Sequence, residues 1–142
     1  MEAHEHRELA RPLSSLAVLR AILGFSILST GIHYTHNFVE VDQYPQSGLG
    51  ISDGAIQVAV LVAWPLLTAI GLYGYRQYAS GRVDRAHVPL LLYSITGLVT
   101  IGHFTDGVPD IPPLFFATIF TDFLAGLAVA GFAIWSMRRG DL

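Results

Sequence analysis

The sequence contains no cysteine and no lysine, and charged residues make up only 13% of it. The absence of cysteine excludes disulfide bonds and thiolate metal sites. An ordinary soluble domain is about 25% charged, so this composition argues against one. All eight basic residues are arginines, and they form no basic stripe that could bind nucleic acid. We therefore expect the lipid bilayer, and not a nucleic acid, as the partner of most of this surface.

Apolar residues are abundant instead, at 52% of the chain, and they are gathered into four long blocks. The blocks cover about residues 12–37, 55–75, 88–105 and 113–137. Each holds roughly the twenty residues that are needed to cross a hydrocarbon core of about 30 Å. Because lipid offers the backbone no hydrogen-bond partners, each block should be a helix. The sequence predicts an all-α integral membrane four-helix bundle, with residues 1–142 as a single domain.

The arginines are segregated along the chain. They lie in the N-terminal segment, between the second and third blocks, and in the C-terminal tail: Arg7, Arg11, Arg20, Arg76, Arg82, Arg85, Arg138 and Arg139. The other two connections, about residues 38–54 and 106–112, carry acidic residues and no arginine. By the positive-inside rule, this distribution predicts that both termini lie in the cytoplasm and that the acidic connections face outward. We expect the membrane to be a bacterial inner membrane.

Two similar sequence motifs lie seventy residues apart, at the ends of the first and third blocks. Residues 28–36 and 98–106 share Leu, Thr, His, an aromatic residue, Thr, and then His or Asp. This pattern predicts two tandem-duplicated helical hairpins, related by a pseudo-two-fold axis along the membrane normal. In such an arrangement His33 and His103 would be symmetry mates.

Five ionisable side chains form the predicted site: His33, His36, His103, Asp106 and Asp122. At about 1.5 Å per residue, three of them, on three different helices, reach the same depth in the outer half of the membrane, roughly 20 Å from the cytoplasmic anchors. His36 and Asp106 lie one turn further out, on the same faces. Imidazole and carboxylate suit divalent Zn, Fe, Mn or Cu. We expect His33, His103 and Asp122 as the ligands, and His36 and Asp106 as supporting or entry residues.

The same residues allow other interpretations. The histidines could instead bond to Asp122 and neighbouring threonines and lock the helices together without a metal. His33 and His103 could be the axial ligands of a b-type haem, or the cluster could carry ions or protons. A bound metal could activate water or oxygen in a membrane-embedded oxidoreductase or hydrolase. No phosphate loop or dinucleotide fingerprint is present, so the sequence names no catalytic residue and no substrate.

Two short motifs resemble the DoxX-like family of small four-helix bacterial membrane proteins. One is the run from Arg20 to Gly24, followed by Gly31 in the same predicted helix, and the other is Gly71-Leu-Tyr-Gly-Tyr-Arg76. The resemblance implies a quinone-linked redox subunit within a larger membrane complex, and we also expect self-association. The chain departs from the family after Gly31, where members usually carry Lys or Gln and this chain carries the run that contains His33 and His36.

Overall fold

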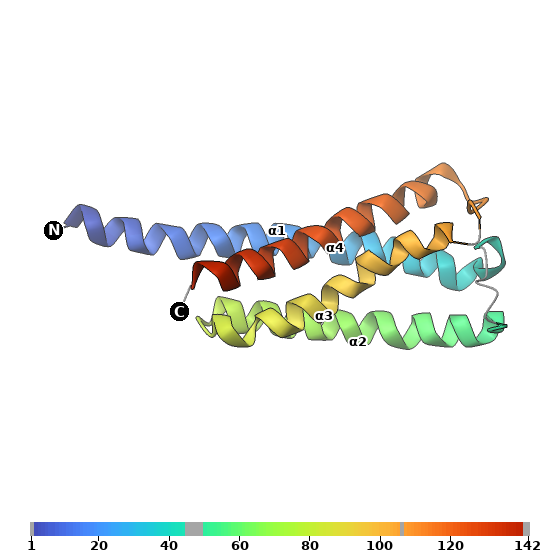
Figure 1. The fold of residues 1–142 in the computed structure, drawn as a ribbon, viewed down its shortest axis with the longest axis horizontal. Coiled ribbons are helices and arrows are strands. Elements are labelled where there is room, and N and C mark those ends of the chain that lie inside the picture. Colours follow the sequence, from blue (N-terminus) through green and yellow to red (C-terminus); the bar gives the residue numbers. More distant parts are fainter. Residues whose placement is uncertain (1, 45–49, 106, 141–142) are drawn as a thin grey trace.

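Four helices make up most of the molecule (Figure 1). The computed structural model describes residues 2–44, 50–105 and 107–140, with side chains from Ser15 onward. The helices are α1 (Glu2–Val39), α2 (Asp53–Ala79), α3 (His87–Leu98) and α4 (Pro113–Arg139). In the described parts of the connections lie three short 3-10 helices: η1 (Val41–Gln43), η2 (Val83–Arg85) and η3 (Val99–Phe104). Both ends of the chain and the α2–α3 connection lie at one end of the bundle.

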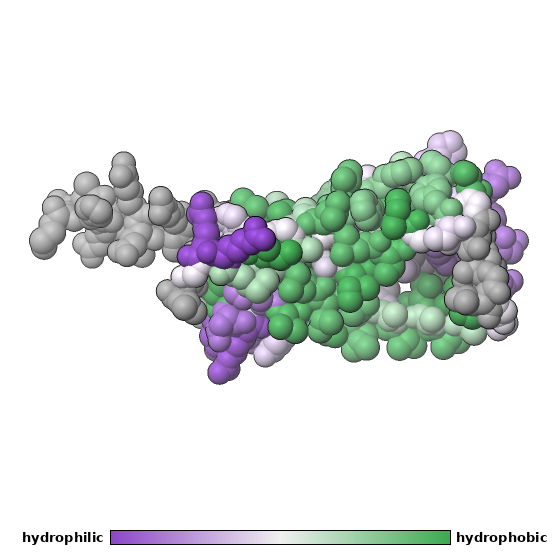
Figure 2. All heavy atoms as spheres, in the orientation of Figure 1, coloured by the Kyte–Doolittle hydropathy of each residue, from purple (hydrophilic) through white to green (hydrophobic). Residues whose placement is uncertain are grey.

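The expectation of four long apolar helices is confirmed. Four helical segments are long and apolar enough to cross a membrane: Ser15–Val39, Asp53–Ala79, Val83–Phe104 and Pro113–Arg139. Figure 2 shows a broad apolar band along the bundle, with hydrophilic residues gathered toward both ends. Many large apolar side chains, such as Phe25, Leu61 and Leu124, lie on this outer surface rather than in the core.

The third helix changes type where the sequence predicts a continuous α-helix over 88–105. The α-helix ends at Leu98, and η3 continues the segment in the 3-10 form. Threonine hydroxyls compete for the backbone here: Thr96 donates to Tyr93 O at 2.8 Å and Thr100 to Gly97 O at 2.7 Å. Such local bonds bend a helix and favour the tighter 3-10 turn. The change sets the direction of the residues that follow, including His103.

Two glycines allow α3 and α4 to approach closely. A Cβ on Gly97 would overlap the carbonyl oxygen of Asp122, and one on Gly126 would lie 2.8 Å from Leu98 N. Small residues at helix contacts let membrane helices pack backbone to backbone. Thr100 adds a hydrogen bond across the same contact, from its hydroxyl to Ile119 O at 2.9 Å. This contact places Asp122 in the bundle interior beside the start of η3.

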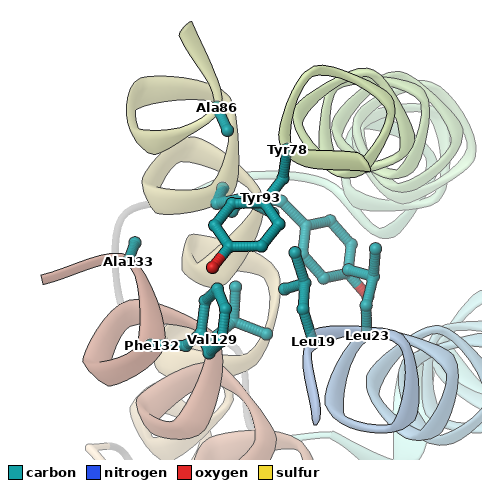
Figure 3. Close-up of a cluster of buried hydrophobic side chains, with 9 residues drawn as sticks. Leu19, Leu23, Tyr78, Ala86, Tyr93, Val129, Phe132 and Ala133 are labelled. Carbon is teal, nitrogen blue, oxygen red and sulfur yellow. The ribbon is translucent and has the colours of Figure 1, made fainter. Parts of the chain in front are cut away.

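The buried interior has two parts. Toward the end with both termini, the core is apolar, and Figure 3 shows Leu19, Tyr93 and Val129 meeting between the helices. The full cluster is Leu19, Leu23, Tyr78, Ala86, Leu90, Tyr93, Val129, Phe132 and Ala133. Toward the other end the fully buried side chains include the polar residues Thr30, His33 and Asp122, beside the apolar Ile119. The candidate site lies in this polar part.

Candidate functional site

His33 is the centre of the polar part. It lies on α1, is completely buried, and contacts two other segments with its two ring nitrogens. Nδ1 faces α4, at 3.1 Å from Thr118 Oγ1 and 3.8 Å from Asp122 Oδ2. Nε2 faces η3, at 3.2 Å from His103 Nε2. The ring therefore joins the carboxylate-bearing helix to the second histidine.

The Thr118 hydroxyl indicates which nitrogen of His33 carries the proton. Its single hydrogen is donated to Phe115 O at 2.6 Å, so toward His33 the oxygen acts as an acceptor. His33 then donates from Nδ1–H, with the Asp122 carboxylate on the same side. The lone pair of the neutral ring is left on Nε2, which is the atom directed at His103.

Asp122 is also fully buried. Ser29 Oγ donates a short hydrogen bond to Oδ1, and Ser29 lies 2.7 Å from Thr121 Oγ1. Within the part of the chain that the structure describes, Oδ2 has no hydrogen-bond partner, and its nearest opposite group is His33 Nδ1. Burying a carboxyl oxygen without a hydrogen bond is costly, and His33 Nδ1 at 3.8 Å lies beyond hydrogen-bond distance of it.

His103 approaches from η3 and is partly exposed. Besides His33, its Nε2 lies 3.5 Å from Asn37 Nδ2, at the long limit of a hydrogen bond. Asn37 is buried, and among the described residues its Oδ1 has no hydrogen-bond partner. The two histidine nitrogens and this amide form one small polar centre.

Tyr44 covers this centre from the connection after α1. It is only 3% exposed, and its ring centroid lies 4.8 Å from that of His103 and 5.7 Å from that of His33. Burial, with a further contribution from the charge of Asp122, raises the pKa of Tyr44 to about 12. Tyr44 is therefore a neutral phenol at physiological pH.

His36 and Asp106 differ from the other predicted residues. His36 lies apart from the histidine pair: its Nδ1 is 2.9 Å from the Tyr44 hydroxyl, and its ring stacks on Phe115 at 3.8 Å. It lines an open groove of about 810 Å³ on the outside of α1. Asp106 lies outside the described residues.

The structure therefore brings together three of the five predicted residues, His33, His103 and Asp122. They do not surround a single point, because Asp122 faces the Nδ1 side of His33 and His103 faces the Nε2 side. Over residues 2–44, 50–105 and 107–140, no group of three or more His, Cys, Asp or Glu side chains is placed to hold a metal ion together. Two imidazole nitrogens are the most that the described residues of these types direct at a common point.

Sequence reasoning missed several members of the site. Ser29, Asn37, Tyr44 and Thr118 do not belong to the predicted site. A signal was available for α1, because Ser26, Ser29, Thr30, His33 and Asn37 recur at the three- and four-residue spacing of one helix face.

Comparisons with family models, with curated proteins and with solved structures found no match for this chain. The resemblance to the DoxX-like family therefore stays a prediction.

Proposed function

We propose that this chain is an integral membrane protein that binds a divalent metal ion between the Nε2 atoms of His33 and His103. The observation that carries the proposal is their separation of 3.2 Å. Metal–imidazole bonds are about 2.0–2.1 Å long, so two nitrogens of a tetrahedral site lie about 3.3 Å apart. The pair is thus already spaced as two ligands of one ion.

The surroundings of His33 support this role. Metal-bound histidines usually donate their other N–H to a carboxylate or a similar acceptor, which holds the ring in place. Thr118 supplies such an acceptor on Nδ1, at 3.1 Å, and the carboxyl group of Asp122 lies 3.8 Å from the same nitrogen. In this proposal Asp122 is a positioning residue rather than a ligand, which revises the role expected from its depth in the membrane.

Asn37 is the nearest further donor. A rotation of its amide by half a turn would exchange Nδ2 and Oδ1, and would bring the unpartnered oxygen toward His103 Nε2. Two histidines and one amide leave room for water or another small ligand, as catalytic metal sites do. An ion held there would be a Lewis acid, so the proposal includes hydrolase or oxidoreductase chemistry.

The membrane placement is part of the proposal. An apolar band and four apolar helices support insertion in a bilayer. The arginine distribution supports cytoplasmic termini, because the arginine-rich α2–α3 connection and both chain ends lie at one end of the bundle. The bacterial inner membrane stays a prediction. The duplicated hairpins and the self-association stay predictions.

Metal uptake by the purified protein tests the proposal. We expect about one equivalent of Zn(II) or of the spectroscopic probe Co(II), and an affinity at least about 100-fold weaker in His33→Ala and in His103→Ala. His87→Ala is the matched control, because His87 lies on α3 away from the site, beside Ser136. Elemental analysis and Co(II) absorption provide the readouts.

Three results would count against the proposal. If the wild type fails to take up Zn, Mn, Fe or Cu, the histidine pair has only a structural role, as a hydrogen bond that holds the helices together. Loss of metal in His87→Ala to the same extent would remove the assignment to the pair. A Soret band or a stoichiometric quinone in the same preparation would favour the haem or quinone alternatives.

A further inference from the structure

A second groove runs between α1 and α4 near the end of the bundle that holds both termini. Its volume is about 500 Å³. Val18 and Ile22 of α1 and Gly131 and Phe132 of α4 form apolar walls, and Arg139 lies at the terminal end of α4. The groove therefore combines a long apolar wall with one cationic group.

Gly131 opens this groove. A Cβ at Gly97 or Gly126 would meet the neighbouring helix, but a Cβ at Gly131 would meet nothing within 4 Å. Glycine inside a helix costs about 1 kcal/mol relative to alanine, and here no helix contact requires it. The missing side chain of Gly131 leaves space on the helix surface beside Phe132.

Trp135 orients the cationic group. The guanidinium carbon of Arg139 lies 4.5 Å from the centroid of the Trp135 ring. Stacking uses the face of the guanidinium and leaves its in-plane N–H donors for a phosphate, which arginine binds in a bidentate manner. Arg139 is exposed, so a lipid phosphate could reach it.

We propose that this groove binds an anionic phospholipid, with the phosphate on Arg139 and one acyl chain along Val18, Ile22 and Gly131. The inference rests on the membrane placement in the proposed function and not on the metal. Basic pockets between membrane helices on the cytoplasmic side are suited to anionic headgroups, which are concentrated in that leaflet. The apolar wall matches the chain of the same molecule.

Native mass spectrometry of the detergent-purified protein provides the test, with phosphatidylglycerol and phosphatidylcholine of identical acyl chains. We expect the anionic lipid to bind about fivefold more tightly than the zwitterionic one, the effect of a single arginine near a lipid phosphate. Arg139→Gln should abolish that preference. Gly131→Leu, which fills the groove, should weaken the binding of both lipids.

Two variants serve as matched controls. Arg138→Gln removes the neighbouring charge, and Gly24→Leu adds a side chain on α1 where a Cβ has open space; neither residue lines the groove. Both should bind the two lipids as the wild type does. Equal binding of the two lipids by the wild type, full binding by Gly131→Leu, or equal losses in Arg138→Gln and Arg139→Gln would overturn the proposal. None of these measurements depends on the metal content.

Discussion

The two halves of the bundle interior are built from the same helices but differ in chemistry. In the half near the termini, the completely buried side chains of α1, α3 and α4 include Leu19, Leu90 and Val129. In the other half, α1 and α4 bury His33 and Asp122 instead. The first half is packed mainly through apolar side chains, with Gln77 and Ser136 also buried there, whereas the second half buries ionisable groups that carry a desolvation cost. The proposed site lies in the half that buries these ionisable groups.

The largest expected effect comes from the contact that positions Asp122. Gly97→Ala places a methyl group against the Asp122 carbonyl oxygen, so α3 and α4 must separate. Overpacking of this kind costs about 3 kcal/mol or more when backbone must move. We expect loss of both thermal stability and metal binding, measured by melting in detergent and by metal uptake.

Gly102→Ala is the matched control for that substitution. Gly102 lies in η3 close to His103, yet a Cβ there would have nothing within 4 Å. Stability and metal uptake should stay near the wild-type values. An unchanged melting temperature in Gly97→Ala would show that this glycine contact does not set the spacing of α3 and α4.

The next effect separates stability from function. Leu90→Ala removes a completely buried side chain from the apolar half, and large-to-small core changes cost about 2–5 kcal/mol. We expect a lower melting temperature with metal affinity retained in the folded fraction. Loss of metal affinity in folded Leu90→Ala protein would break the division between a structural half and a functional half.

Asp122→Asn should show the opposite behaviour. The amide keeps the shape of the side chain but removes the charge that faces His33 Nδ1. Removing such a supporting group weakens metal binding by about 10–100-fold. Isothermal titration with Zn(II) measures the change, and a melting temperature close to that of the wild type shows that the fold is intact. Unchanged affinity would exclude Asp122 as a positioning residue.

Much of this arrangement was predictable because it depends on length and hydropathy. The four helices follow from apolar runs that match the thickness of a bilayer. The meeting of His33, His103 and Asp122 follows from their equal depth, since the rise per residue in a helix is constant. The depth of a residue in the membrane does not specify how its helix is rotated about the helix axis, however. Depth therefore could not show that Asp122 and His103 lie on opposite sides of the His33 ring.

The parts that were not predictable depend on segments without a periodic pattern. The 3-10 turn of η3 arises from local threonine hydrogen bonds, and it sets the direction of His103. Tyr44 comes from an irregular connection that folds over the bundle end, and His36 turns toward it and toward Phe115. Such contacts are decided by tertiary packing, which hydrophobic spacing alone does not encode.

The smallest expected effect concerns whether water reaches the polar half of the interior. The pKa of Tyr44 measures this. Burial, reinforced by the charge of Asp122, raises the pKa of this phenol from 10.0 to about 12. The folded protein thus keeps the proton between these two pH values, while the unfolded chain releases it. The stability linked to the neutral phenol is complete below pH 10 and declines as the pH rises toward 12.

Ultraviolet titration of tyrosinate measures this effect. The difference between wild type and Tyr44→Phe should show one group that ionises near pH 12, and Tyr73→Phe, which removes a half-exposed tyrosine of α2, controls for the loss of a phenol. Ionisation near pH 10 would mean that water reaches the ring and the polar centre beneath it. The two halves would then differ in hydration as well as in side chains, and the metal proposal would need a site open to solvent rather than one enclosed by Tyr44.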